Sequence, residues 1–157
     1  VKIILPRGKL WAGLRSNKLK KKIWHGKYIN LLSLKMKKKF KLFIDKAKKL
    51  RQDTFKAFIE KGEAHLGGSF SIIEILIYLY EEYLKKDDKF ILSKAHASFP
   101  LCLILKSKGY DVELKTHLEI DEKNGIFCTT GSLGHGLPIG TGMAFARKKT
   151  SAKGKIV

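Results

Sequence analysis

The sequence predicts an α/β protein, and two kinds of pattern support this fold class. Apolar residues recur at helical spacing in several segments, while short apolar runs bounded by polar residues are typical of buried strands. Three polar or glycine-rich loops that carry a histidine come directly before predicted helices. The 157 residues are 44% apolar and 30% charged, which is typical of a globular protein and excludes a disordered or collagen-like chain. We expect the part present to be mostly helical.

The net charge of +19 is concentrated near the amino terminus. Residues 1–50 hold 17 of the 33 Lys and Arg residues and a single acid, Asp45, so the rest of the chain is nearly balanced. Tight binding to a nucleic-acid backbone requires several basic side chains on one ordered face, and no sequence motif here supports such a face. We therefore do not expect nucleic-acid binding.

Residues 1–35 contain no acid and no sustained period. We interpret them as a basic leader that is disordered or not native, and residues 36–157 as the folded domain. The leader has three interpretations: a targeting peptide, a basic interaction tail, or residues upstream of a natural start at Met36. The third is favoured, because transit peptides are rich in Arg and Ser whereas this segment is rich in Lys.

Cysteine usage and hydropathy point to the cytoplasm. Cys102 and Cys128 belong to no CxxC pair, which fits a reducing compartment. The most apolar stretch, residues 70–80, contains Glu74 and is far shorter than the roughly 20 apolar residues that span a bilayer, so no membrane segment is expected. The histidines lack the HExxH or paired-cysteine spacing of zinc sites, and no metal ligand is assigned to this chain.

The first part of the domain predicts two helices separated by a loop. Over residues 42–61, apolar side chains recur every three to five positions with lysines between them, as in an amphipathic helix. Residues 62–69 form the loop, because each glycine inside a helix costs about 1 kcal/mol relative to alanine. Ser71 and Glu74 form a capping box that starts the second helix. That helix is expected to present five side chains to the core: Ile72, Leu76, Leu79, Tyr80 and Tyr83.

A short apolar run at residues 90–92 predicts a buried strand or its end. A helix over residues 99–108 follows, with Ser98 as its N-cap and Gly109 just past its end. Residues 110–127 are expected to form a loop with a helical turn near 112–118.

The glycine-rich loop at residues 129–136 opens the last predicted helix. Gly136, Gly140 and Ala144 share one face of this helix, and this stripe of small residues lets another backbone approach closely. Residues 154–157 are expected to begin a second buried strand, in a chain that we expect to be incomplete.

Histidine stands just before a predicted helix at His65, His96 and His135. Free backbone N–H groups at helix N-termini attract anions, and an imidazole adds a directional donor or exchanges a proton near neutral pH. A purely structural role is the alternative for any one histidine, but three such loops in an α/β pattern favour a ligand site. Residues 131–136 read GSLGHG, which is neither a Walker A loop nor a dinucleotide-binding motif. These residues predict an anion-binding α/β protein.

Three motifs follow one another along the chain. Residues 64–71 read AHLGGSFS, residues 90–98 read FILSKAHAS, and residues 130–136 read TGSLGHG, with Gly-Met-Ala at 142–144. In order and spacing these motifs resemble the amino-terminal, thiamine diphosphate-binding part of the transketolase family, over about residues 37–157. The resemblance implies the thiamine diphosphate-binding fold, a parallel sheet flanked by helices, here truncated before the family's metal-binding motif.

The resemblance also implies roles for individual residues. His96 would contact the cofactor diphosphate, and His65 would be a catalytic and substrate-binding residue near the reacting carbon. The backbone of Gly131, Ser132 and Leu133 would hold the aminopyrimidine ring of thiamine diphosphate. His135 replaces the family's usual Gln and would contact substrate. Mg²⁺ or another divalent metal would neutralise the diphosphate, with its ligands expected beyond Val157.

Two further departures from the family's motifs bear on function. Ala95 replaces a glycine, which is tolerable if its φ angle is negative, and Thr116-His117-Leu118 stands where the family carries Gly-His-Pro in a longer segment. Substrate choice is therefore in doubt.

The expected function is that of a partial transketolase subunit. The parent enzyme would transfer a glycolaldehyde unit from a ketose phosphate to an aldose phosphate, as in the pentose phosphate pathway. The chain would be inactive alone and would pair with a second copy or with a carboxy-terminal transketolase subunit. Whether the chain is itself an enzyme is left open. The alternatives are a related thiamine-dependent synthase, a non-enzymatic remnant, or a basic nucleic-acid-binding module.

Overall fold

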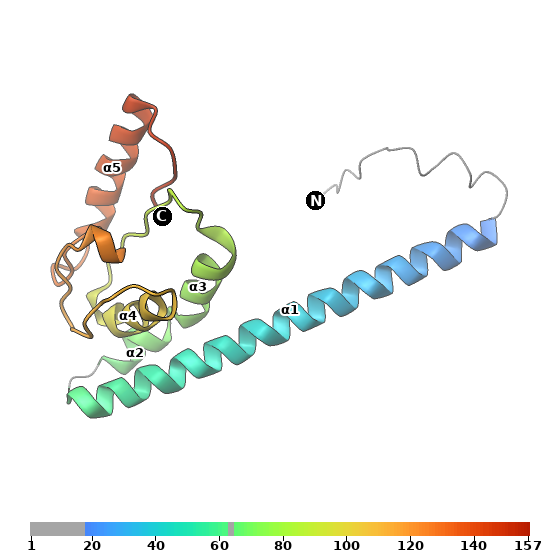
Figure 1. The fold of residues 1–157 in the computed structure, drawn as a ribbon, viewed down its shortest axis with the longest axis horizontal. Helices are drawn as coiled ribbons and strands as arrows, with labels where there is room; N and C mark the ends of the chain where they lie inside the picture. The colour runs from blue at the N-terminus through green and yellow to red at the C-terminus, as the bar shows by residue number, and fades with distance from the viewer. Residues whose placement is uncertain (1–17, 63–64) are drawn as a thin grey trace. The chain divides into compact units, whose positions relative to one another are not determined.

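The computed structural model describes the backbone of residues 18–62 and 65–157, with side chains from residue 33 onward in those ranges. The chain divides into two compact units, residues 1–41 and 42–157. In the first unit the described backbone is the amino-terminal portion of helix α1 (Lys18–Lys61), drawn in blue in Figure 1. This helix begins earlier than the helix predicted from residue 42. The predicted domain boundary after residue 35 stays a prediction, and residues 1–17 of the predicted leader lie outside the described residues.

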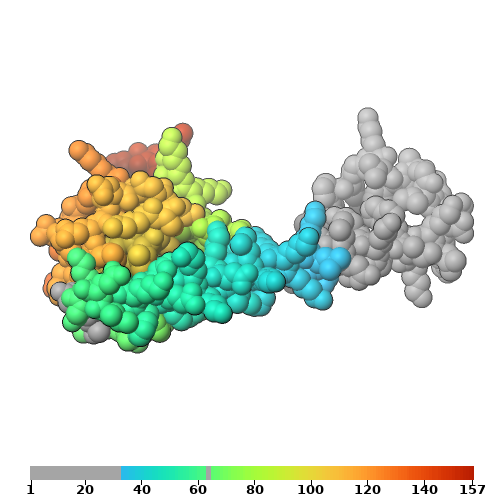
Figure 2. Space-filling model, turned by 60° about the horizontal axis from the view of Figure 1, so that its bottom comes forward, coloured from blue at the N-terminus to red at the C-terminus, as the bar shows by residue number. Residues whose placement is uncertain are grey.

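The second unit begins with the remainder of α1, where the predicted amphipathic helix is confirmed. Its buried face consists of small and apolar side chains at helical spacing. Phe55, by contrast, points away from the core and is half exposed. Figure 2 shows this part of α1 lying against the segment that follows residue 98. The buried residues of the face are Ala47, Leu50, Thr54, Ala57 and Phe58.

Short helices and turns make up most of the rest of the second unit (Figure 1). Helices α3 and α4 pack against each other, and α2 packs on α4. The elements are α2 (Leu66–Phe70), α3 (Ile73–Tyr78), the π-helical turn η2 (Leu79–Tyr83), the 3-10 turn η3 (Ala95–Ala97), α4 (Ser98–Ser107), the 3-10 turn η4 (Glu122–Asn124) and α5 (Gly136–Thr150).

The main core lies between α3, α4 and α1. Ile73, Leu76 and Cys102 are completely buried there, because each occupies the face of its helix that points to a neighbouring helix. A second, smaller cluster joins the end of α1 to α4, where the rings of Phe58 and Phe99 stack with centroids 4.8 Å apart. Both clusters hold the start of α4 in place, which matters for the candidate site below.

The structure corrects several sequence predictions around α3. The predicted loop at residues 62–69 contains α2. Ser71 and Glu74 do not form a capping box, because Ser71 Oγ donates to the Gly68 carbonyl and Glu74 pairs with Arg51. Of the five predicted core residues, Leu76 and Leu79 are buried, Ile72 and Tyr80 are partly buried against the core, and only Tyr83, at 39% exposed, is wrong. Ile73 and Ile77 are buried in addition.

Two predictions around α4 also need correction. Gly109 lies just past the helix with a φ of +91°, as predicted, but Ser98 is the first helical residue and not the N-cap. Because η3 runs directly into α4, Ser98 Oγ donates to the Ala95 carbonyl and leaves the helical N–H groups uncapped. The helical turn predicted near 112–118 is absent there, and a turn forms instead at η4.

The two predicted strand segments lie side by side and pair in parallel. Lys89 and Ile156 form a single parallel bridge, with the N–H groups of Lys89 and Ile91 donating to the carbonyls of Lys155 and Val157. Apart from an antiparallel bridge between Asp121 and Ile126, this is the only β pairing in the described parts of the chain. The arrangement is compatible with an α/β fold, although the described residues are mostly helical and form no extended sheet.

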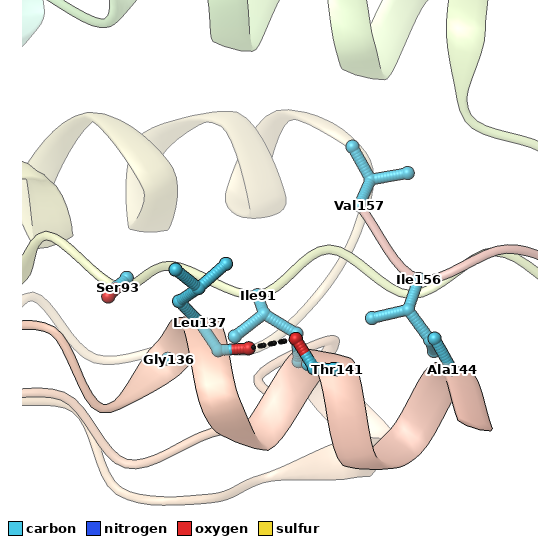
Figure 3. Close-up of a pocket in the computed structure, with 9 residues that line it drawn as sticks. Ile91, Ser93, Gly136, Leu137, Thr141, Ala144, Ile156 and Val157 are labelled. Carbon is cyan, nitrogen blue, oxygen red and sulfur yellow. Dashed lines mark hydrogen bonds between the residues drawn. The ribbon is translucent and has the colours of Figure 1, made fainter. Parts of the chain in front are cut away.

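The predicted small-residue face of α5 packs on these paired segments. A Cβ atom added at Gly136 would lie 2.6 Å from Ser93 Cα, so only glycine fits this contact, and Gly140 faces Ile91 and Ile156 at ordinary contact distance. Figure 3 shows Ile91 and Ile156 pointing toward α5. An apolar groove of about 300 Å³ runs beside this contact. None of the helices in the described ranges is long and apolar enough to span a bilayer.

Replacing Thr54 with Val is expected to stabilise the protein. Thr54 Oγ1 is fully buried and has no hydrogen-bond partner in the described structure, and a buried hydroxyl without a partner costs about 1–3 kcal/mol. Thr54→Val should therefore raise the free energy of unfolding by about 1 kcal/mol, measured by urea denaturation. Thr130→Val is the matched control: Thr130 Oγ1 accepts the Leu118 N–H at 2.8 Å, so this variant should lose stability. Equal effects of the two substitutions would contradict the prediction.

Stability should fall in acid partly through Glu81. Lys108 Nζ at 2.7 Å, together with Lys46 Nζ, hydrogen-bonds the Glu81 carboxylate and holds its pKa below the ordinary value of 4.5. Because the folded state lowers this pKa, the interaction stabilises fully above about pH 4.5 and is lost as the pH falls through the folded value. Glu81→Gln should be less stable than the parent at pH 7, and the difference should shrink in urea titrations below pH 4.5. Glu60→Gln, at an exposed position of α1, is the control.

Candidate functional site

The segment 93–98 is the centre of the candidate site, because every motif loop contacts it or its direct neighbour. The AHLGGSFS loop reaches it through Ser69, whose Oγ donates to the His96 carbonyl at 2.6 Å. The loop before α5 reaches it through the close contact of Gly136 with Ser93. The segment also holds residues 116–118, since Ser98 Oγ donates to the Thr116 carbonyl at 2.8 Å. Segments far apart in sequence are therefore fixed around one short stretch of backbone.

His65 and His96, the two histidines of the first and second motifs, lie next to each other. Their ring centroids are 4.2 Å apart and the ring planes are inclined by 58°. His65 is exposed and His96 is half-buried. Neither imidazole makes a hydrogen bond to another described residue, so their ring nitrogens are available to a ligand. The sequence prediction that these two residues share one site agrees with this geometry.

Gly68 makes the histidine pair possible. A Cβ atom at this position would lie 2.6 Å from the Cβ of His96, closer than any real side chain allows. The backbone of α2 therefore packs directly against His96. Ser69, which is completely buried, joins the same two segments through its hydrogen bond to the His96 carbonyl. At Gly67, one position earlier, a Cβ would meet no atom within 4 Å. Only the second glycine of the motif is required by packing.

Lys94 contributes a positive charge two residues before His96 in the sequence. Its Nζ donates to Ser71 Oγ at 2.6 Å, which links the second motif to the end of the first by another hydrogen bond. An ammonium group and two imidazoles carried by two joined motif segments suit an anionic ligand. His96 lies in η3, directly before α4, as predicted for a histidine that precedes a helix. His65 occupies the N-cap position of α2, a short helix within the predicted loop.

His117 also belongs to this region, in contact with the third motif. Gly131 has a φ of +113°, and a Cβ there would lie 2.9 Å from His117 Nδ1. Thr130 and Leu118 fix the register, because the Thr130 N–H donates to the Leu118 carbonyl and the Leu118 N–H to Thr130 Oγ1, both at 2.8 Å. From the sequence, His117 was notable only as a departure from a family motif. Its distance from Gly131 along the chain gave no sign of this contact, which depends on the fold of residues 118–130.

The remaining predicted site residues lie on the loop before α5. Leu133 is 58% exposed, and Ser132 accepts the His135 N–H through its carbonyl at 3.3 Å. His135 is the N-cap residue of α5, again as predicted. No hydrogen bond or ring contact between described residues joins His135 or Leu133 to the histidine pair. The structure thus brings His65 and His96 together and sets His117 against Gly131, while His135 makes no contact with them.

Ala95, which stands where the family has glycine, fits its position without strain. Ser151 is the only residue other than glycine with a positive φ in the described ranges, so the φ of Ala95 is not positive. Ala95 is also buried, and its carbonyl accepts the Ser98 hydroxyl. Alanine can therefore replace the family's glycine at position 95, because the φ angle there is not one that requires glycine.

The cysteine thiols and the Tyr80 hydroxyl are poorly placed to act as nucleophiles or bases, because they are buried. Burial raises the pKa of the Cys102 thiol to about 11, and burial likewise raises the pKa of Tyr80 well above its ordinary value, so both stay protonated. Cys128 is buried as well. Across the described ranges, no group of three or more His, Cys, Asp or Glu side chains is placed to hold a metal ion.

Comparison with known proteins agrees with this geometry. A family model described as "Transketolase, thiamine diphosphate binding domain" matches residues 41–155. The chain is 34% identical over 118 residues to a 6-deoxy-6-sulfo-D-fructose transketolase subunit of Clostridium sp. (strain MSTE9), covering 62% of this chain and 43% of that protein. It is 35% identical over 113 residues to an apulose-4-phosphate transketolase subunit of Actinobacillus succinogenes, covering 59% and 41%. It is 31% identical over 131 residues to transketolase 2 of Escherichia coli K12, covering 69% and 20%.

The match of the family model over residues 41–155 defines this unit as a domain of the thiamine diphosphate-binding class. The chain belongs to the transketolase family, and its residues 41–155 match the family's thiamine diphosphate-binding domain. It spans less than half the length of the relatives named as subunits and about a fifth of the Escherichia coli relative.

Substituting Gly68 with Ala should disturb the histidine pair. The added Cβ would overlap His96, and overpacking of this kind costs about 1–3 kcal/mol. Gly68→Ala should lower the free energy of unfolding by that amount in urea and shift the imidazole signals of His65 and His96 in NMR spectra. Gly67→Ala, one residue earlier in the same helix, should leave the imidazole signals unchanged and stability equal or higher, by up to about 1 kcal/mol. Identical behaviour of the two variants would disprove the close contact.

Proposed function

We propose that this chain holds the diphosphate of thiamine diphosphate at His96 and forms part of a transketolase that transfers a two-carbon glycolaldehyde unit from a ketose phosphate to an aldose phosphate. One observation carries the proposal: His65 and His96 lie with ring centroids 4.2 Å apart, and their nitrogens have no partner among the described residues. Because His65 is exposed and His96 is half-buried, both imidazoles can be reached from solvent, and the pair is open to a ligand.

The residues fit the cofactor in charge and in shape. The close approach of Gly68 to His96 leaves the α2 backbone against the imidazole, and Lys94 lies in the same segment, so a diphosphate would meet cationic and N–H donors. In the proposed role, His96 donates a hydrogen bond to the diphosphate. The Gly131–Leu133 backbone, whose glycine has a φ that other residues rarely adopt, supports the aminopyrimidine ring.

Thiamine diphosphate, when bound, supplies a carbon nucleophile that attacks the carbonyl of a ketose. In this proposal His65 acts on the substrate as a proton donor or acceptor at a hydroxyl or carbonyl oxygen, because its imidazole is exposed and lies beside His96. His135 is assigned to the substrate side of the same site, and His117 joins it through its contact with Gly131.

Sugar phosphates are the proposed substrates, and Mg²⁺ or another divalent ion the proposed metal, with ligands outside the described residues. The relatives do not agree on one sugar: one is named for 6-deoxy-6-sulfo-D-fructose and another for apulose 4-phosphate. The two buried thiols fit a reducing compartment, and we propose the cytoplasm and carbohydrate metabolism of the pentose phosphate type.

A second subunit is part of the proposal. Helices α3 and α5 expose large apolar side chains to solvent in this chain, which soluble domains commonly bury against a partner. Two of the relatives are themselves named as transketolase subunits. We assign the partner as a second copy or a carboxy-terminal transketolase subunit, and the chain alone as inactive. The exposed residues are Ile75 and Tyr78 on α3 and Leu137, Ile139 and Phe145 on α5.

Calorimetry with thiamine diphosphate and Mg²⁺ tests the proposal. The chain alone should bind little cofactor, whereas the chain co-purified with a carboxy-terminal transketolase subunit should bind it and transfer two-carbon units between sugar phosphates. His96→Gln should abolish this binding, because it removes the imidazole that meets the diphosphate. His135→Gln introduces the family's common residue and should retain binding, which makes it the matched control.

Two results would count against the proposal. A complex that binds no thiamine diphosphate would refute the assigned site. Strong binding by the chain alone that disappears in His96→Gln would support the site and refute the need for a partner.

A further inference from the structure

A second hollow, of about 450 Å³, lies away from the histidine site. It opens at the amino end of the extended segment that begins at Lys89, whereas His96 follows the other end of that segment. His96 is seven positions after Lys89, and extended backbone rises about 3.3 Å per residue. The hollow is bordered by Lys86, Asp87, Asp88, Lys89, Phe127, Arg147 and Lys153.

The walls of this hollow are held together by Arg147. Its Nη1 donates to the carbonyls of Asp87 at 2.8 Å and Lys153 at 2.6 Å, which binds the end of α5 and the following turn to the 86–89 turn. Gly154 lies so close to this turn that an added Cβ would be 1.9 Å from the Asp87 carbonyl oxygen. The hollow is therefore formed by the fold itself and does not depend on a ligand.

Positive charge predominates in this lining. Lys86 and Lys153 form no ion pair with any described residue. Lys89 Nζ lies 4.5 Å from the centroid of the Phe127 ring and also pairs with the Glu122 carboxylate. Of the two acids, Asp88 has a side chain that is only 3% exposed, and its carboxylate pairs with Lys155 Nζ. Its carboxylate accepts the N–H groups of Lys85 and Lys155.

Asp87 is the one acid in the lining whose carboxylate has no partner among the described side chains. It opposes four basic residues that come from three separate stretches of chain. Basic residues in the last turn of α5 are favoured by the helix dipole. The dipole does not explain Lys86 and Lys89, because they lie outside this helix.

We propose that this hollow is a second anion site that binds a chain of two or three phosphoryl groups, independent of the proposed cofactor site. Its volume falls in the range of small-ligand pockets and exceeds what a single ion would need. Arg147 makes both of its hydrogen bonds to described residues through Nη1, so the other edge of its guanidinium can meet phosphate oxygens. The ligand is either an inorganic polyphosphate or the phosphate chain of a nucleotide.

NMR titration of the full chain with inorganic tripolyphosphate at low salt tests this site. The amide signals of residues 86–89, 147 and 153 should shift on binding. Removing two of the cations in Lys86→Gln/Lys153→Gln should weaken binding at least fivefold, and Asp87→Asn should tighten it about twofold, because it removes the one opposing charge. Lys48→Gln/Lys56→Gln removes the same charge from exposed positions on α1 and should leave the affinity unchanged.

Three outcomes would overturn the proposal. Equal weakening by the α1 control pair would mean that net charge alone attracts the anion. Weaker binding in Asp87→Asn would show that the hollow does not select anions. Loss of the shifts in His96→Ala would place the anion at the proposed cofactor site, whereas unchanged shifts in that variant support a separate site even if thiamine diphosphate fails to bind.

Titrations with ATP and with adenosine separate the two sources of the ligand. ATP that binds at least tenfold more tightly than tripolyphosphate assigns a nucleotide, and equal affinities assign an inorganic polyphosphate. Adenosine that binds as tightly as ATP would overturn the proposal, because the phosphoryl groups would then contribute nothing.

Discussion

Close backbone approach to the segment 93–98 is the constraint on which the rest of this domain depends. Gly68 lets α2 rest on His96, and Gly136 lets α5 rest on Ser93, each at a distance that no side chain could tolerate. Two backbone carbonyls of the segment, those of Ala95 and His96, accept the hydroxyl groups of Ser98 and Ser69. Glycines and small hydroxyl residues are therefore required for packing as much as for chemistry.

The extended segment that begins at Lys89 carries a different feature at each of its two ends. At the carboxyl end of the extended segment, the imidazoles of His65 and His96 meet with their nitrogens open to a ligand, as the proposed diphosphate site requires. At its amino end, Arg147 and Gly154 fasten the end of α5 to the 86–89 turn. A rigid connection at one end holds the backbone that positions the reactive groups at the other.

Much of the helical part and the identity of the motif residues could be predicted from the sequence. The apolar spacing of residues 42–61, the glycine after α4 and the histidines at helix starts are local features, and local propensity decides them. The predicted capping box at Ser71 was wrong because other groups bind both side chains: the hydroxyl donates to the nearby Gly68 carbonyl, and the Glu74 carboxylate pairs with Arg51, which is distant in sequence. The prediction of a helical turn near 112–118 was wrong, because Val112 and Leu118 at the two ends of this segment are both buried in the core.

The sequence by itself determined the family and the residue types at the site, because the three motifs are contiguous stretches whose order and spacing can be read along the chain. Only the tertiary structure decided which of these residues meet. The 4.2 Å pairing of His65 with His96 and the contact of His117 with Gly131 join segments far apart in sequence. Such contacts depend on how helices pack and where glycines permit close approach, and packing distances are set by all the surrounding side chains at once.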